Sequence, residues 1–175
     1  MPGLEDLYRE IILDHYRSPR NRGELAVPPA HRSEGFNPLC GDEVVVYVKV
    51  DDDLVSDVKI AGQGCSISQS SASMMSAAVK GRSIAEARRL ITAFKAMMSI
   101  HEQSIGGDAA VGADGDDDEH APAAAASLLE NDGLGELAAL QGVVKFPVRI
   151  KCATLSWNTL AQALDEVSTL KGPAA

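Results

Sequence analysis

Three cysteines are the side chains of this 175-residue chain that most clearly could do chemistry. Cys40 lies in a Pro/Gly-rich turn, Cys65 follows a Gly-Gln-Gly segment, and Cys152 precedes the last amphipathic stretch. All three are predicted to lie at boundaries between elements, whereas a cysteine that only fills the core more often lies inside a strand or helix. Thiolates in such places serve as nucleophiles or as ligands of metal ions.

The expected surroundings of two cysteines favour the thiolate form. The N-terminus of a helix carries free backbone N–H groups and the positive end of the helix dipole, which stabilise a nearby negative charge. Cys65 and Cys152 are both expected to lie where a helix starts. Arg149 and Lys151 flank Cys152 and are expected to act on its thiol in the same direction.

Asp42 is the nearest candidate for a further ligand. Three thiolates are one short of a closed tetrahedral zinc shell, and a carboxylate can supply the fourth position. Only Gly41 separates Asp42 from Cys40, and glycine allows a turn sharp enough to aim both side chains at one ion. Asp42 could equally be a solvated turn residue. The cysteines are spaced 25 and 87 residues apart, which matches no zinc-ribbon pattern.

The histidines supply no competing motif. His101 lacks the second histidine of a zincin helix, and we expect it to end its own helix. His15 is predicted at the edge of the apolar face of an amphipathic helix, and His31 and His120 lie in polar segments. A metal-free thiol redox protein is disfavoured because the chain has no Cys-x-x-Cys pair.

Periodic hydrophobic patterns predict the elements that must position these residues. Apolar residues at intervals of three and four predict a helix over 4–17, which Pro19 ends. Runs rich in β-branched residues at 43–50 and 54–61 predict an antiparallel hairpin that turns on three aspartates. A third strand is expected near 31–36, which would complete a small meander.

Helices are predicted for much of the remaining chain. A helix rich in serine and alanine follows Cys65 and ends near Gly81. Ser83 and Glu86 have the spacing of a capping box, which predicts the start of another helix. The final helix is predicted over 155–170, where leucines recur on one face.

An acidic segment interrupts this pattern. Residues 103–125 are rich in glycine, alanine and acid, and they show neither helical nor strand periodicity, which predicts a flexible insertion. The acidic run lacks the residue order of a calcium-binding loop. Residues 127–140 are predicted to form one or two short helices. We therefore expect residues 1–175 to form a single domain that carries this insertion.

Composition excludes several functional classes. The formal net charge is −9, from 16 basic and 25 acidic residues, and the basic residues are scattered, so binding to nucleic acid is not expected. No apolar stretch reaches the roughly 18 residues of a membrane-spanning helix, so no membrane association is predicted. The N-terminal residues do not resemble a secretory signal, and a cytoplasmic protein is expected.

Several segments of the chain resemble the IscU/NifU-like family of iron–sulfur cluster assembly proteins. They are Leu-Tyr at 7–8, Ile-Leu-Asp-His-Tyr at 12–16, Pro-Arg-Asn-Arg-Gly at 19–23, Asn-Pro-Leu-Cys-Gly-Asp at 37–42, Gly-Gln-Gly-Cys-Ser-Ile-Ser at 62–68, and Arg-Ile-Lys-Cys-Ala at 149–153 with Trp157. The resemblance spans nearly the whole chain apart from the acidic segment. It implies a compact α+β fold in which helices cover one face of a short antiparallel sheet. It also implies a zinc ion held by Cys40, Asp42, Cys65 and Cys152.

Two differences from the scaffold proteins make the chain more similar to the SufU branch of that family. Residues 144–148 read Val-Lys-Phe-Pro-Val where scaffolds carry a chaperone-recognition segment, and Lys151 stands where they have a histidine. The region 102–140 is long enough to contain the extra segment of the SufU branch. Because Arg149 and Lys151 flank Cys152, they are expected near the metal or facing a partner.

The SufU branch implies a zinc-dependent sulfurtransferase. Such a protein accepts persulfide sulfur from a PLP-dependent cysteine desulfurase of the SufS type and passes it towards a downstream assembly scaffold. Zinc keeps thiols deprotonated but blunts their nucleophilicity, so a ligand must leave the metal before it reacts. In the family a desulfurase histidine takes that ligand's place. Cys40 in its Pro/Gly turn is the predicted acceptor, and the harder oxygen donor of Asp42 would make the site more exchangeable.

The alternative is a scaffold that builds a [2Fe–2S] cluster, or holds iron, on the same four ligands. Metal content separates the two predictions, because zinc is colourless whereas an iron–sulfur protein is brown.

Overall fold

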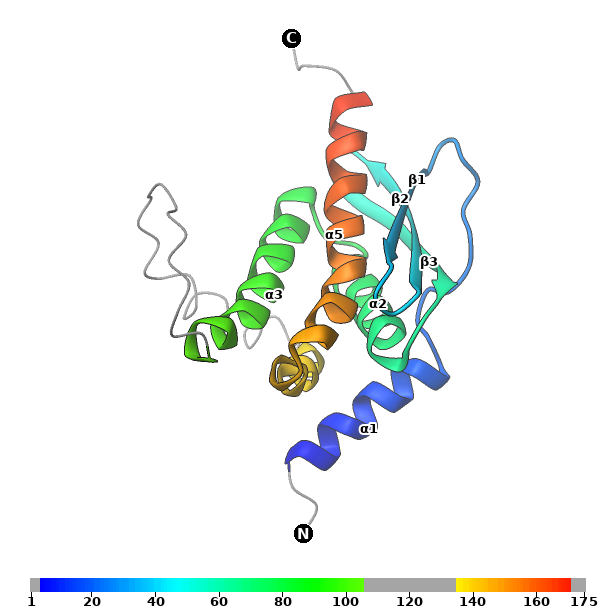
Figure 1. The fold of residues 1–175 in the computed structure, drawn as a ribbon. Helices are drawn as coiled ribbons and strands as arrows, with labels where there is room; N and C mark the ends of the chain where they lie inside the picture. The colour runs from blue at the N-terminus through cyan, green and yellow to red at the C-terminus, as the bar shows by residue number, and fades with distance from the viewer. Residues whose placement is uncertain (1–3, 106–134, 171–175) are drawn as a thin grey trace.

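The computed structural model describes residues 4–105 and 135–170, which form an antiparallel sheet packed against helices (Figure 1). In chain order the elements are α1 (Leu4–Arg17), β1 (His31–Asn37), β2 (Asp42–Asp51), β3 (Leu54–Gln63), α2 (Ser66–Val79), α3 (Ile84–Ile105), the 3-10 helix η1 (Gly135–Lys145) and α5 (Pro147–Leu170). The predicted α+β class is confirmed. Within the described ranges no helix is long and apolar enough to cross a membrane.

The sheet is the meander that the sequence predicts, in the order β1-β2-β3, with both neighbouring pairs antiparallel. Asp51 pairs with Leu54, so two residues make the turn between β2 and β3. Those residues, Asp52 and Asp53, have φ angles of 49° and 62°. Positive φ at both positions is typical of a type I′ hairpin turn, and aspartate tolerates it better than most residues.

Helices α2 and α5 lie against the sheet, and α3 packs on α5 (Figure 1). Alternate residues of β2 supply the buried face of the sheet, including Val44, Val46 and Val48. On the helical side Trp157 stacks on Phe94, with ring centroids 4.4 Å apart. The core therefore lies between the sheet and the helices.

The helix ends follow local sequence chemistry. The capping box is confirmed, because Ser83 Oγ accepts from Glu86 N at 3.2 Å and Glu86 Oε2 accepts from Ser83 N at 3.0 Å. Helix α1 ends two residues before Pro19. Serines make α2 narrow enough to be almost wholly buried, and Ser71 Oγ accepts the indole N–H of Trp157 at 3.1 Å.

The final helix corrects the prediction, because α5 begins at Pro147 and not at residue 155. Proline suits the first helical position, since its φ is already helical and its missing N–H has no partner there. The residues that follow are largely solvent-facing, including Val148, Arg149 and Lys151, so they show no apolar periodicity. The hydrophobic pattern therefore detects only the part of α5 that packs on the core.

The predicted insertion at 103–125 lies mostly outside the described residues. Helix α3 continues to Ile105, so the first three of these residues are helical. The predicted short helices at 127–140 fall partly outside as well, and the described part, from Gly135 onward, belongs to η1.

Candidate metal centre

The four residues predicted to share a metal come from three separate parts of the fold. Cys40 lies in the β1–β2 loop, Asp42 opens β2, Cys65 immediately precedes α2, and Cys152 lies in α5. Their side chains meet at one end of the sheet. The ligand atoms of Cys40, Asp42 and Cys152 all lie within 4.8 Å of one another, and Cys65 Sγ is 3.8 Å from Asp42 Oδ2.

Asp42 is a buried carboxylate, with 0% of its surface exposed. Its Oδ1 accepts the backbone N–H of Cys65 at 2.9 Å, and its Oδ2 faces the Cys65 thiol. Burial of a carboxylate is costly unless a nearby positive charge compensates it. A cation held between Asp42 and the thiols would supply that charge, so the donor set fits a metal ion.

Two glycines allow this close approach. At Gly64 a Cβ atom would stand 2.7 Å from Asp42 Oδ1, closer than real side-chain contacts. At Gly62 a Cβ would stand 2.3 Å from the carbonyl oxygen of Glu43, and the backbone has a φ of +110°. The Gly-Gln-Gly segment before Cys65 is therefore a steric requirement of the site.

Cys65 lies where the sequence places it, at the start of α2. It is the N-cap residue, and its Sγ accepts the backbone N–H of Ser68 at 3.4 Å. The sulfur therefore lies against the first turn of α2, at the positive end of the helix dipole.

Cys152 differs from the prediction, since it lies inside α5 and not at a boundary between elements. Its side chain is fully buried, and this burial, followed by contacts with Asp42 and Cys40, raises the pKa of the Cys152 thiol well above its usual range. The Cys152 thiol donates to Cys40 Sγ at a distance of 3.3 Å.

The three thiols differ in access to solvent: Cys40 is exposed, Cys65 is intermediate and Cys152 is buried. A reagent or partner approaching from solvent therefore reaches Cys40 first. Cys40 is accessible because it lies in a loop, as the sequence predicts.

Arg149 lies beside the thiols. Negative charge on Cys65, a hydrogen bond to the same thiol, and charge on Cys152 raise the pKa of the Arg149 guanidinium above its usual value. Lys151, the other cationic residue singled out in the sequence, is exposed on α5. The structure thus brings Arg149 to the predicted centre, and it leaves Lys151 open to solvent one residue before Cys152.

Asn37 is a site residue that the sequence reasoning missed. This buried side chain directs its Nδ2 towards Cys152 Sγ, 3.7 Å away, while its Oδ1 accepts the backbone N–H of Leu39 at 3.2 Å. The Asn37 carbonyl also accepts the N–H of Gly41 at 2.9 Å. One residue thus contacts the buried thiol and shapes the loop that carries Cys40. The Asn-Pro dipeptide signals a turn, but it does not show what the amide contacts.

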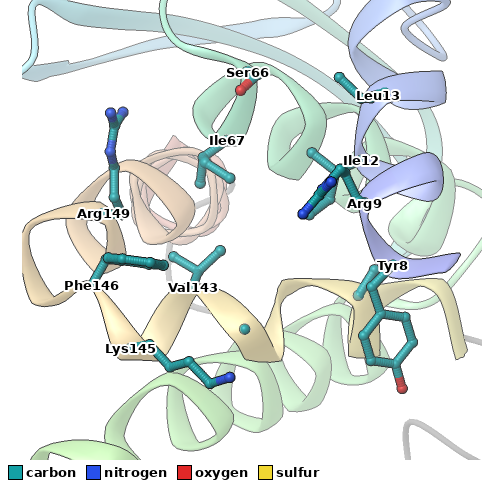
Figure 2. Close-up of a pocket in the computed structure, with 12 residues that line it drawn as sticks. Tyr8, Arg9, Ile12, Leu13, Ser66, Ile67, Val143, Lys145, Phe146 and Arg149 are labelled. Carbon is teal, nitrogen blue, oxygen red and sulfur yellow. The ribbon is translucent and has the colours of Figure 1, made fainter. Parts of the chain in front are cut away.

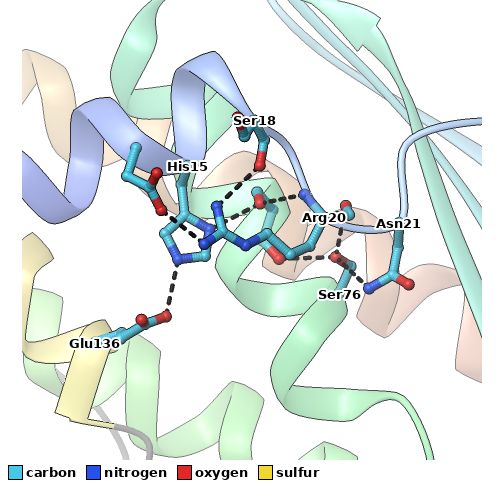
Figure 3. Close-up of polar contacts among 8 residues, drawn as sticks. His15, Ser18, Arg20, Asn21, Ser76 and Glu136 are labelled. Atoms are coloured by element: carbon cyan, nitrogen blue, oxygen red, sulfur yellow. Dashed lines mark hydrogen bonds and ion pairs between the residues drawn. The ribbon is translucent and has the colours of Figure 1, made fainter.

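His15 is also placed differently from the prediction, because it is fully buried instead of lying at the edge of an apolar face. Its Nδ1 is 2.8 Å from Ser73 Oγ and its Nε2 is 2.8 Å from Glu136 Oε2 (Figure 3). Arg20 N donates to the same Ser73 hydroxyl at 2.8 Å. The imidazole therefore joins α1 to α2 and η1, and it lies outside the group formed with Cys40.

The other histidines add no ligand to the described site. His31 pairs with Glu166 on α5. The structure does not describe the side chain of His101, and His120 falls within the undescribed part of the chain.

The sequence pattern of the NifU-like N terminal domain matches residues 7–114. The chain belongs to this family. That confirms the resemblance seen in the sequence and places the chain among iron–sulfur cluster assembly proteins.

Relatives within the NifU-like family match along nearly the whole chain. The zinc-dependent sulfurtransferase SufU of Bacillus subtilis is 41% identical over 161 residues, which cover 92% of this chain and 91% of that protein. The iron–sulfur cluster assembly scaffold protein IscU of Streptococcus pyogenes is 37% identical over 161 residues, covering 92% and 84%.

Solved structures of the family share the fold. A putative iron–sulfur cluster assembly scaffold protein for the SUF system from Fervidobacterium islandicum superposes with a TM-score of 0.68 at 31% identity, covering 93% of this chain and 99% of that one. A nitrogen-fixing NifU-like protein from Brucella abortus has a TM-score of 0.65 at 23% identity, covering 95% and 97%, and shows the likeness of fold alone.

Proposed function

We propose that this protein is a zinc-dependent sulfur acceptor in iron–sulfur cluster assembly, with Cys40 as the residue that takes the sulfur. The observation that carries the proposal is the place of Cys40, the most exposed of the three cysteines, with its thiol next to the buried Asp42 and Cys152. The relative from Bacillus subtilis, which covers nearly the whole chain, is named a zinc-dependent sulfurtransferase.

Cys40, Asp42, Cys65 and Cys152 would hold the zinc ion. Three sulfur donors and one carboxylate match the ligand preferences of zinc, and four protein donors satisfy a tetrahedral ion. When bound, zinc keeps the thiols deprotonated at neutral pH and offsets the buried charge of Asp42.

Cys40 would accept sulfur from a cysteine persulfide of a PLP-dependent desulfurase. The Cys40 thiolate attacks the outer sulfur of that persulfide and forms a new S–S bond. The S–S bond of the donor breaks, and its electron pair leaves with the cysteine thiolate of the desulfurase. Exposure suits Cys40 to this step, whereas the buried Cys152 cannot meet a partner's cysteine without movement of the loop above it.

Arg149 and Lys151 would assist from the rim of the site. The Arg149 guanidinium neutralises charge on Cys65 and Cys152, and the exposed Lys151 is available to an acidic partner surface. The Cys40 persulfide would then pass its sulfur to a downstream assembly scaffold in the cytoplasm.

The second candidate is a scaffold that holds iron or a [2Fe–2S] cluster on the same residues. It is favoured by the 37% identity to a protein named an iron–sulfur cluster assembly scaffold protein. Iron–sulfur sites also prefer thiolate donors, so the ligand types alone suit both functions.

Persulfide transfer and metal content, measured on the same samples, test the proposal. The chain is purified without oxygen, its zinc and iron are quantified, and it is incubated with a cysteine desulfurase and ³⁵S-labelled cysteine. We expect colourless protein with one zinc per chain and label on Cys40. Cys40→Ser should abolish labelling, since serine forms no persulfide. Asp42→Ala should weaken zinc binding but leave Cys40 able to take sulfur.

Two outcomes contradict the proposal. Undiminished label on Cys152 in the Cys40→Ser variant would assign the acceptor role elsewhere. Brown protein that contains iron, with no labelling at any cysteine, would favour the scaffold.

A further inference from the structure

A groove lies next to the metal centre, outside its four candidate ligands. It has a volume of about 670 Å³ and lies between α1, the start of α2, η1 and the start of α5 (Figure 2). The described residues that line it are Tyr8, Arg9, Ile12, Leu13, Ser66, Ile67, Ala139, Gly142, Val143, Lys145, Phe146 and Arg149.

The floor of the groove is apolar. Ile12 of α1, Ile67 of α2 and Val143 of η1 turn their side chains towards one shared space (Figure 2). Phe146, between η1 and α5, is 62% exposed beside them. Exposed apolar surface of this kind, gathered in a concave site, marks a place where another molecule binds.

The charged residues of the groove are all cationic. Arg9, Lys145 and Arg149 line it, and its described lining contains no carboxylate. The whole chain carries a formal net charge of −9, so the positive charge of this groove is opposite to the net charge of the protein. An apolar floor with a cationic rim complements a ligand that carries apolar groups and negative charge together.

We propose that the groove docks an amphipathic acidic segment of a partner protein. Leucine or phenylalanine side chains of that segment fill the floor, and its carboxylates face Arg9 and Arg149. This arrangement is the helix-in-groove form of peptide recognition. Nucleic acid would need a broader basic surface than three cationic residues supply.

The groove and the metal centre share a wall. Ser66, which lines the groove, follows Cys65 directly, and Arg149 faces both the groove and the Cys65 thiol. A carboxylate bound at Arg149 would compete with the thiols for the same guanidinium. Docking at the groove would therefore place the partner segment beside the sulfur-accepting centre without touching Cys40.

The test uses designed peptides and does not depend on sulfur transfer. A fluorescein-labelled helical peptide of about 16 residues carries Leu and Phe at positions i, i+3, i+4 and i+7 and Glu elsewhere. A second peptide has the same apolar residues with Lys in place of Glu. Binding to the full zinc-loaded chain is followed by fluorescence anisotropy. We expect only the Glu peptide to bind, with ¹H–¹⁵N chemical-shift changes at the groove residues.

Matched variants locate the contact. Arg9→Glu reverses a charge in the groove and should weaken binding about tenfold. Arg17→Glu makes the same change on the same helix outside the groove, and it should change the affinity by less than about twofold. Phe146→Ser should weaken binding through the apolar floor. Both Arg9 and Phe146 are exposed, so these substitutions leave the fold intact.

Three results would overturn the inference. Equal binding of the Glu and Lys peptides would remove the role of charge. If Arg9→Glu and Arg17→Glu weaken peptide binding equally, the effect comes from the net charge of the protein and not from the groove. Binding of phosphatidylglycerol vesicles that is lost in Arg9→Glu, with no binding of the Glu peptide, would assign the groove to a lipid surface.

Discussion

At the scale of single residues, the side chains of the candidate centre differ in burial, and this difference suits some to reaction and others to holding a metal. Cys40 is exposed in a loop, whereas Asp42 and Cys152 are fully buried on a strand and a helix. A group that must meet another protein needs access, and a group that fixes a metal needs a rigid position. The difference in burial therefore supports different roles for chemically identical thiols.

Asn37 allows a prediction at this scale. Asn37→Ala removes the N–H directed at Cys152 and the acceptor for Leu39 N, so it should lower the free energy of unfolding by about 1–3 kcal/mol. Asn37→Asp keeps the acceptor but sets a carboxylate against the Cys152 sulfur, and it should weaken metal binding further. Competition with a chromophoric chelator measures zinc affinity, and the sulfur-to-metal charge-transfer band of the cobalt-substituted protein reports on the thiolate.

The control for Asn37 is Asn158→Ala, which removes an exposed asparagine from α5. It should change neither zinc affinity nor the cobalt spectrum. If Asn37→Ala matches this control in both measurements, the amide does not position the buried thiol.

At the scale of elements, the centre depends on an approach of β2 and the segment leading into α2 that is closer than ordinary side chains permit. Gly62 at the end of β3 and Gly64 just after that strand lie against β2, where a Cβ would meet the Glu43 carbonyl or the Asp42 carboxylate. The N–H of Cys65 then reaches Asp42. The Asp42 side chain thus joins the hairpin to the start of α2.

Gly64→Ala tests this close approach. Its added methyl would lie 2.7 Å from Asp42 Oδ1, and the fully buried Asp42 has little room to move. We expect a loss of about 1–3 kcal/mol in unfolding free energy, together with weaker zinc binding. Gly142→Ala is the control, since nothing lies within 4 Å of its Cβ position and no positive φ opposes it. Urea denaturation and chelator competition measure both effects, and equal behaviour of the two variants would contradict the prediction.

The contact between β1 and α5 predicts a dependence on pH. Hydrogen bonds from Gln162, then His31 and Ser33, hold the pKa of Glu166 below its ordinary value of 4.5. A carboxyl whose pKa is lower in the folded chain stabilises the fold above its unfolded pKa, and that contribution is lost as the pH falls through the folded value. Wild-type protein should therefore exceed Glu166→Gln in stability at pH 7, and the difference should shrink below pH 4.5.

Urea midpoints of both proteins between pH 7 and pH 3 measure this difference. Glu24→Gln, which alters another exposed glutamate outside this contact, should show no such convergence. A Glu166→Gln difference that stays constant with pH would show that the contact does not favour the charged carboxyl.

The sequence predicted the elements that depend on interactions between neighbouring residues. It did not predict the features that depend on tertiary packing. The aspartate turn of the hairpin, the capping box at Ser83 and the position of Cys65 before a helix all follow from short-range chemistry. The first turns of α5 carry solvent-facing residues, so periodicity could not reveal that Cys152 lies inside a helix. The roles of Asn37 and His15 depend on partners far along the chain, which a single sequence does not identify.

At the scale of the whole molecule, the hydrophobic core and the candidate centre are separate sources of stability. The core lies between the sheet and the helices, with Trp157 stacked on Phe94. The centre joins the β1–β2 loop, the start of α2 and the second turn of α5 at one end of the sheet. Loss of the metal should therefore loosen this end while the core remains folded.

Metal removal tests this separation. A ligand present at about a thousandfold above its Kd stabilises the folded state by about 4 kcal/mol. For a domain of this size about 1 kcal/mol corresponds to a shift of roughly 2–4 °C, so chelation should lower the Tm by ~10 °C. Three segments lose their common ligand at once, and Asp42 is left as a buried carboxylate with uncompensated charge. Scanning calorimetry with and without chelator, with zinc quantified in each sample, measures the shift.

Two further measurements decide what such a shift means. The near-ultraviolet circular dichroism of Trp157 should persist in the metal-free chain, because its stacking on Phe94 is independent of the cysteines. Cys65→Ser/Cys152→Ser, which lacks two candidate ligands, should start at a lower Tm and respond little to chelator. Added zinc should restore the wild-type Tm and leave this variant unchanged. An identical Tm for zinc-loaded and verified metal-free wild type would show that the core alone sets stability. Loss of the tryptophan signal on chelation would show that the centre and the core unfold as one unit.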